Sequence, residues 1–283
     1  TRLRRQRLHP QALRAQRVGG PRAAPYESAQ VGRAAAGVLA LAMGAPLLAA
    51  AQSAELPTSV ELGYAREHLS NDSPDWQDTG IDITHRFGAR EYLGVSLHDA
   101  KRFGVEDVSA AAFYLMPLSD KVAASIEGSL SPGASFLPQK MLAATLQYEF
   151  APAWLLHGGL KSASYAQDHV TEGSLKLERY VSDFSWSVGW KPVHALGRYA
   201  QSFEVRGNYY YGARNMVGII AAYGQEATSV APDEVVIADV RSIALLGRHH
   251  LTPRWALTYA ITRTEQGTFY TRTGGRLGVQ YSF

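Results

Sequence analysis

From residue 57 onward, apolar and polar residues alternate with a period of two through one segment after another. In residues 184–190, Phe, Trp, Val and Trp alternate with Ser, Ser and Gly. The same alternation occurs in residues 142–150, 203–209 and 255–262. A period of two places neighbouring side chains on opposite faces of an extended chain, so these segments are predicted to be β-strands.

Two kinds of turn signal separate these segments. Tight turns are predicted at residues 87–90, 118–121, 151–153, 180–183, 212–215 and 251–254. Looser connections are predicted near residues 70–75, 103–106, 131–139, 166–169, 193–199, 226–236 and 265–268. This arrangement predicts an all-β fold, an antiparallel up-and-down transmembrane barrel of about 14 strands, with roughly 12 or 16 as the alternative counts.

The direction of the alternation favours a membrane barrel over a soluble β-sandwich. Large residues such as Trp154, Trp186, Trp190 and Trp255 lie on the apolar face, and Ser, Gly, Thr, Gln and scattered charges lie on the other. This is the pattern of a lipid-facing outside and a polar lumen. Aromatic residues also recur beside the tight turns, at 148–154, 180–186 and 209–211, and predict an interfacial girdle on the periplasmic side.

The same alternation predicts which charged side chains project into the lumen. They are Glu61, Asp82, Arg86, Glu127, Glu149, Lys176, Glu178, Glu204, Arg206 and Arg276. Both signs are present. Charges separated by water would line a pore, whereas charges that pair would close it and leave a structural element.

The N-terminal segment differs in charge from the rest of the chain. Residues 1–33 hold eight arginines and one acid, Glu27, and residues 34–51 hold no charge. Of 28 basic and 25 acidic residues in the whole chain, 20 and 24 lie downstream, so the remainder has a net charge of −4. A nucleic-acid partner is therefore not expected. The chain has no cysteine, which excludes disulfides, thiolate metal sites and cysteine nucleophiles.

The N-terminal segment is typical of a secretion signal. Arg33 precedes an apolar stretch, 34–43, then Gly-Ala-Pro at 44–46 and small residues up to Ala51. Cleavage is predicted after Ala51, with Ala54 as the alternative. Residues 1–51 are thus predicted to be a basic extension plus signal peptide, and residues 52–283 an outer-membrane barrel of a Gram-negative bacterium.

The last residues alternate in the same way and end on an aromatic ring. Leu277, Val279, Tyr281 and Phe283 share one face. This is similar to the assembly signal of outer-membrane barrels, which the barrel assembly machinery reads by strand addition. That machinery is an expected partner during insertion.

Several stretches together resemble the YaiO-type outer-membrane β-barrel domain. They are Glu61–Tyr64, Ile83–Arg90, Lys101–Gly104, Ser129–Pro138 and Leu251–Trp255, with the terminal strand. The resemblance extends over most of residues 57–283. It implies an outer-membrane barrel and supplies no activity or catalytic residues.

Candidate chemistry in the lumen is sparse. Ser96 and His98 share an inward face, and Glu127 faces inward on a nearby strand, so a Ser–His–Glu hydrolase site is the weak catalytic candidate. His249 and His250 are adjacent and point to opposite faces of a strand, so they do not favour one metal ion. No metal or cofactor is predicted.

These observations predict a passive channel, or an export or envelope component, for solutes or polysaccharide. The alternatives are a barrel lipid hydrolase of the lipid A deacylase or phospholipase type, and a non-conducting structural scaffold. Expected partners are outer-membrane lipid and lipopolysaccharide, with envelope polysaccharide or export proteins as further candidates.

Overall fold

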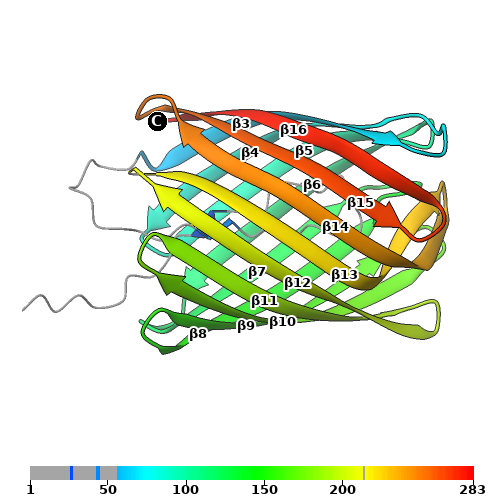
Figure 1. The fold of residues 1–283 in the computed structure, drawn as a ribbon. Coiled ribbons are helices and arrows are strands. Elements are labelled where there is room, and N and C mark those ends of the chain that lie inside the picture. The colour runs from blue at the N-terminus through cyan, green and yellow to red at the C-terminus, as the bar shows by residue number, and fades with distance from the viewer. Residues whose placement is uncertain (1–25, 28–42, 45–55, 213) are drawn as a thin grey trace, which may run out of the picture.

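The computed structural model describes residues 26–27, 43–44, 56–212 and 214–283. Within these residues, fourteen antiparallel strands close into one barrel (Figure 1), which confirms the predicted fold and strand count. Each strand pairs with its neighbours in sequence, and β16 pairs with β3 to close the ring. The wall strands are β3 (Thr58–Leu69), β4 (Trp76–Gly88), β5 (Glu91–Arg102), β6 (Val105–Pro117), β7 (Val122–Leu130), β8 (Lys140–Ala151), β9 (Trp154–Ser164), β10 (His169–Val181), β11 (Phe184–Ala195), β12 (Arg198–Tyr211), β13 (Asn215–Ala231), β14 (Glu234–His250), β15 (Trp255–Gln266) and β16 (Tyr270–Ser282).

The remaining described elements are two short strands near the N-terminus. β1 (Tyr26–Glu27) and β2 (Met43–Gly44) pair with each other. None of the described residues forms a helix long and apolar enough to cross a membrane. Apart from residues 43 and 44, the predicted secretion signal and its cleavage points at Ala51 and Ala54 lie outside the described residues.

Large apolar side chains cover the outside of the barrel. Leu62 is 61 % exposed and Leu160 is 71 % exposed, whereas Glu61 beside Leu62 is 8 % exposed. Leaving apolar surface in water costs about 25 cal/mol for each Å², so a surface of this kind is stable in the hydrocarbon of a bilayer. The alternation therefore has its apolar side on lipid and its polar side in the lumen.

The two ends of the barrel differ in their connections. At one end, here the turn end, lie the turns 89–90, 118–121, 152–153, 182–183, 212–214 and 251–254, together with the start of β3 and the end of β16. The other end, here the loop end, carries the connections 70–75 and 131–139. In bacterial barrels the short turns are periplasmic, which assigns the loop end to the cell exterior.

Three connections predicted as loose loops are two-residue turns. They are 103–104, 196–197 and 232–233. Phe103–Gly104 and Leu196–Gly197 have positive φ at both residues, as type I′ hairpin turns require. At Pro232–Asp233 only Asp233 has a positive φ, 57°. The connection predicted near 226–236 is accordingly no separate external loop, because β13 continues to Ala231 and β14 begins at Glu234.

Aromatic rings contact one another along the turn end. Trp154 meets Trp186 edge to face at 5.6 Å, Phe184 lies 4.8 Å from Tyr209, and Trp255 lies 4.7 Å from Tyr281. Tyr180 and Tyr210 correct the predicted girdle. Both occupy inward positions of the alternation and belong to an apolar cluster inside the barrel.

Leu277, Val279 and Tyr281 of the predicted assembly signal lie on the outer face of β16, and Phe283 directly follows the strand. Leu277, Val279 and Phe283 are 62 %, 49 % and 53 % exposed. Tyr281 stacks with Phe283, at a ring separation of 6.0 Å.

Candidate functional site

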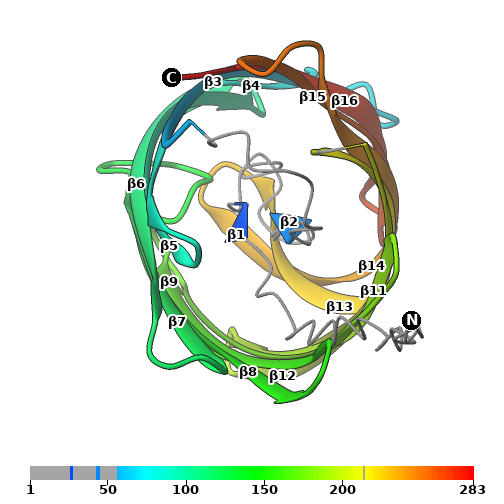
Figure 2. The same ribbon diagram turned by 90° about the vertical axis from the view of Figure 1, so that its left-hand side faces the viewer.

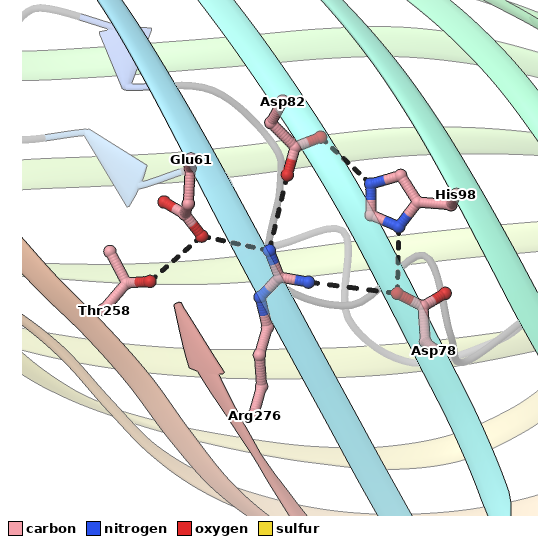
Figure 3. Close-up of polar contacts among 6 residues, drawn as sticks. All are labelled: Glu61, Asp78, Asp82, His98, Thr258 and Arg276. Carbon is pink, nitrogen blue, oxygen red and sulfur yellow. Dashed lines mark hydrogen bonds and ion pairs between the residues drawn. The ribbon is translucent and has the colours of Figure 1, made fainter. Parts of the chain in front are cut away.

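A polar network extends over five neighbouring strands of the inner wall, from β15 through β16, β3 and β4 to β5 (Figure 3). The Arg276 guanidinium donates to Glu61 Oε1 at 3.0 Å and to Asp82 Oδ2 at 3.4 Å. Its other terminal nitrogen lies 3.9 Å from Asp78 Oδ1. Thr258 donates to Glu61 Oε1 at 3.0 Å. The guanidinium therefore sits among three carboxylates.

His98 completes this network on β5. Its Nδ1 lies 2.9 Å from Asp78 Oδ1 and its Nε2 lies 2.9 Å from Asp82 Oδ1. Both aspartates also contact Arg276, so the imidazole and the guanidinium share them (Figure 3). A ring with both nitrogens beside carboxylates is suited to the protonated form, in which both nitrogens donate.

Inward-facing glycines let these side chains lie flat along the wall. A Cβ at Gly63 would overlap the Arg276 guanidinium, and a Cβ at Gly80 would overlap the His98 ring. In each case the side chain occupies the space above a backbone that lacks its own side chain. The network therefore runs along the wall of the barrel.

Gly80→Ala is expected to lower the free energy of unfolding by about 2 kcal/mol, because overpacking displaces His98 from both aspartates. Urea unfolding of the barrel in bilayers, followed by tryptophan fluorescence, measures the change. Gly158→Ala is the matched control, since a Cβ there meets nothing within 4 Å. Equal stability of the two variants would contradict the tight seat inferred for His98.

A second set of ion pairs lines the wall formed by β9 to β12. Lys161 Nζ lies 2.9 Å from Glu172 Oε2, and Lys191 Nζ lies 3.1 Å from Glu204 Oε2. Glu178 contacts both His157 Nε2, at 3.0 Å, and Lys176 Nζ, at 3.3 Å. Each pair joins adjacent strands or residues of one strand. Acid and base thus alternate along the wall.

All ten charged residues predicted for the lumen occupy inward positions of the alternation. Glu61, Asp82, Glu149, Glu178, Arg206 and Arg276 are each less than a tenth exposed. Sequence reasoning did not name Asp78, Lys161, Glu172 and Lys191 among them. These four obey the same alternation, so applying it to every residue of β4, β9, β10 and β11 would have found them.

The three residues of the weak catalytic candidate have other partners. Asp78 and Asp82 engage both ring nitrogens of His98, which leaves neither nitrogen to activate the Ser96 hydroxyl. Ser96 lies opposite Asp82 on the neighbouring strand, and Glu127 lies on β7, two strands away from β5. The structure therefore places His98 in an ion-pair network and not in a Ser–His–Glu relay.

His249 and His250 are also separated by the strand. His249 Nδ1 lies 3.2 Å from the Tyr211 hydroxyl, on the outer side. Within the described residues, no group of three or more histidine, aspartate and glutamate side chains is placed to hold a metal ion.

At the loop end, the β13–β14 hairpin leaves the barrel wall. β13 pairs with β12 only as far as Gly224, and β14 pairs with β15 only from Val240. Residues 225–239 continue as a two-stranded ribbon whose strands pair with each other. We call this segment the ribbon. Figure 2 looks along the barrel from the turn end and shows the hairpin crossing the interior instead of following the rim.

The ribbon meets the β7–β8 loop, residues 131–139, across the mouth. Asp233 N donates to Ser135 O at 2.8 Å, and Ser229 Oγ donates to Phe136 O at 3.1 Å. Four strands, β9 to β12, separate β8 from β13 on one side of the ring, and six separate β14 from β7 on the other. Among the described residues, these hydrogen bonds bridge the barrel, whereas the ion pairs of the walls do not.

Asp107 on β6 fixes the 131–139 loop. Its carboxylate accepts hydrogen bonds from the backbone N–H groups of Ser135, Phe136 and Leu137, at 2.9 to 3.0 Å. Phe136 is fully buried, and the Arg102 guanidinium lies 5.0 Å from its ring centroid. The loop is therefore anchored by both polar and apolar contacts.

A stack of two guanidiniums on one indole fills the adjacent part of the mouth. Arg102 and Arg272 each lie 4.5 Å from the Trp76 ring centroid. Arg272 also donates to Glu67 Oε2 at 2.8 Å. Phe103 and Tyr270 pack edge to face on the same indole. No sequence motif signalled this cluster, because its members come from β4, β5, β16 and a turn.

Comparisons with known proteins agree with this architecture. The family model of the YaiO membrane β-barrel domain matches residues 57–229. No curated protein matches the chain. Among solved structures, the CymD monoaromatic hydrocarbon channel is similar with a TM-score of 0.56 at 11 % identity, over 81 % of this chain and 89 % of its own.

Two further solved structures share the fold. Omp33, an outer membrane protein of Acinetobacter baumannii, has a TM-score of 0.52 at 12 % identity, over 81 % of this chain and 100 % of its own. A bacterial polysaccharide outer membrane secretin has a TM-score of 0.53 at 5 % identity, over 81 % and 99 %. At these identities the likeness is one of fold.

Proposed function

The chain belongs to the YaiO membrane β-barrel domain family, and from this premise we propose that it is a passive outer-membrane channel for small hydrophilic solutes. It is an outer-membrane β-barrel of a Gram-negative bacterium, and its solved structural neighbours include channels. The observation that carries the proposal is the lining. Charged side chains of both signs line the inner wall on β16 and β3 to β5 and on β9 to β12, and their pairs lie along it.

The way these charges pair favours a lined path over a packed interior. Arg276, Glu61 and Asp82 come from three adjacent strands, as Lys161 and Glu172 come from two. A structural interior would be expected to join opposite walls or to exclude charge, since buried ions are costly unless fully paired. Pairing along the wall satisfies the charges without contacts across the barrel, as a lined path requires.

The lining also favours a class of solute. CymD, which shares the fold, is a monoaromatic hydrocarbon channel. The inner wall of this chain carries alternating acids and bases at mid-height, which suit neutral polar or zwitterionic solutes and disfavour hydrocarbons. Because the two signs nearly balance, we expect weak ion selectivity.

The other expectations gain less support. A lipid hydrolase would need His98 free to act as a base, whereas Asp78 and Asp82 hold both of its nitrogens. Polysaccharide export is supported only by the similarity in fold to the polysaccharide secretin. A non-conducting scaffold remains the alternative that the test below distinguishes, motivated by the bridged mouth.

The test is planar-bilayer conductance of the purified protein, with reversal potential measured under a salt gradient. We expect stable single-channel steps and a reversal potential near zero. Glu204→Gln removes a lining acid and leaves Lys191 positive, so it should shift selectivity toward anions. Glu265→Gln, half-exposed and paired with Arg263 on the outer face, is the matched control and should not.

Two results would count against this proposal. If a barrel whose folding is verified by heat-modifiable gel migration shows no conductance, the non-conducting scaffold is favoured. Conductance with the same selectivity in both variants would place the path elsewhere than along the β9–β12 wall.

A further inference from the structure

We propose that the ribbon, residues 225–239, is a hinged lid that opens and closes the outer mouth, with the 131–139 loop as its fixed seat. The inference rests on the proposed channel and adds its regulation. It stands on three observations, which concern the absence of ladder pairs between ribbon and wall, the firm attachment of the seat and the small number of hydrogen bonds between ribbon and seat.

Among the described residues, neither edge of the ribbon forms ladder pairs with the barrel wall. All ladder pairs between Gln225↔Asp239 and Ala231↔Glu234 are internal to it. Its base is held by Gly267 N donating to Asp239 O at 2.7 Å and by Gln225 Nε2 donating to Asp239 Oδ1 at 2.9 Å. Rotation about this base breaks no internal pair, so the ribbon can move as one piece.

Gly224 marks the hinge. Its φ of 147° belongs to a region of backbone conformation that is essentially restricted to glycine. The residue also lies against the β12 backbone, where a Cβ would overlap the carbonyl oxygen of Gln201 and the Cα of Ser202. β13 turns away from β12 at this residue, so a special backbone conformation coincides with the start of the ribbon.

The seat is held much more firmly than the lid. Asp107 ties three successive N–H groups of the loop, and Phe136 is fully buried beneath it. The ribbon contributes two hydrogen bonds to that loop, Tyr270 donates one to Ser229 O at 3.2 Å, and Gln266 Nε2 donates one to Thr228 Oγ1. Ala227 and Ile237 pack on a small apolar cluster of β10 to β12. The ribbon is held less firmly than the seat, so it is the element expected to move.

Closing the ribbon over the mouth also buries a polar atom without a partner, at a cost in free energy that opening removes. Glu226 lies on the ribbon, is 4 % exposed, and its Oε2 has no hydrogen-bond partner within the described residues. Lys191 on β11 and Glu172 on β10 influence it electrostatically, and Ser202 hydrogen-bonds with it. A buried carboxylate oxygen without a partner costs free energy in the closed position.

The absence of cysteine in the sequence permits a direct test. Ser135→Cys and Asp233→Cys place one thiol on the seat and one on the lid, at positions whose backbones are hydrogen-bonded. Such backbones lie about 5 Å apart, within the range that a disulfide spans. The oxidised double variant should conduct at least about tenfold less than the same protein after reduction, and each single variant should not respond to reductant.

The outcomes separate the lid from the channel. Equal conductance before and after reduction, with the disulfide verified, would overturn the lid and leave the channel standing. If the protein is silent in both states, the channel proposal fails. Spin labels on the two cysteines then decide about the lid itself. A short and a long distance population support a moving ribbon, and a single short one overturns it.

Discussion

Gly224→Ala is expected to raise the open fraction of the channel by about tenfold or more. A φ of 147° is strained for alanine, and its Cβ would overlap Gln201 and Ser202 in the closed position. Strain of this kind costs about 1–3 kcal/mol, and 1.4 kcal/mol corresponds to a tenfold change in an equilibrium. Because the barrel wall beyond the hinge is unchanged, the strain falls on the closed ribbon. Open probability in single-channel records measures it.

Gly197→Ala is the control for this variant. Gly197 also has a positive φ, 67°, and lies in the β11–β12 turn of the same barrel end, but a Cβ there meets nothing within 4 Å. It should cost about 1 kcal/mol of stability through the backbone alone and leave open probability unchanged. An equal rise in both variants, or none in Gly224→Ala, would refute the hinge.

Arg276→Met is expected to destabilise the folded barrel by about 3–5 kcal/mol. The guanidinium contacts Glu61, Asp82 and Asp78, and the residue is 6 % exposed. Its loss leaves several buried carboxylates with His98 as the remaining cationic partner of two of them. The temperature at which the folded band disappears on a gel, and urea unfolding in bilayers, both measure the loss.

Arg263→Met provides the comparison. Arg263 lies on β15, next to β16, and its side chain is 60 % exposed, with Glu265 at 3.8 Å. Exposed pairs of this kind contribute about 0–1 kcal/mol, so stability should change little. Adding Glu61→Gln to Arg276→Met should restore part of the loss, since it removes one uncompensated charge. Equal stability of both single variants would mean that the inner network is not a structural unit.

Much of the fold could be predicted from the sequence because the decisive signal is local. Whether a residue faces lipid or lumen depends on its position along its own strand, as Leu62 beside Glu61 illustrates. The strand number followed from the spacing of turn residues. The same local signal is wrong where β13 and β14 extend beyond the barrel wall. At 226–236, Pro, Asp and Glu predict a loop, although β13 and β14 continue on both sides of a two-residue turn.

Local alternation therefore specifies the strands, their faces and the inward position of each lining charge. Which of those charges meet depends on the closed barrel. Arg276 and Glu61 lie 215 residues apart and become neighbours because β16 closes on β3. Ser229 and Phe136, 93 residues apart, meet because the ribbon leaves its wall and crosses the mouth. Alternation specifies a direction for each side chain, whereas ring closure and the bend at Gly224 specify its partner, and neither is encoded by a local period.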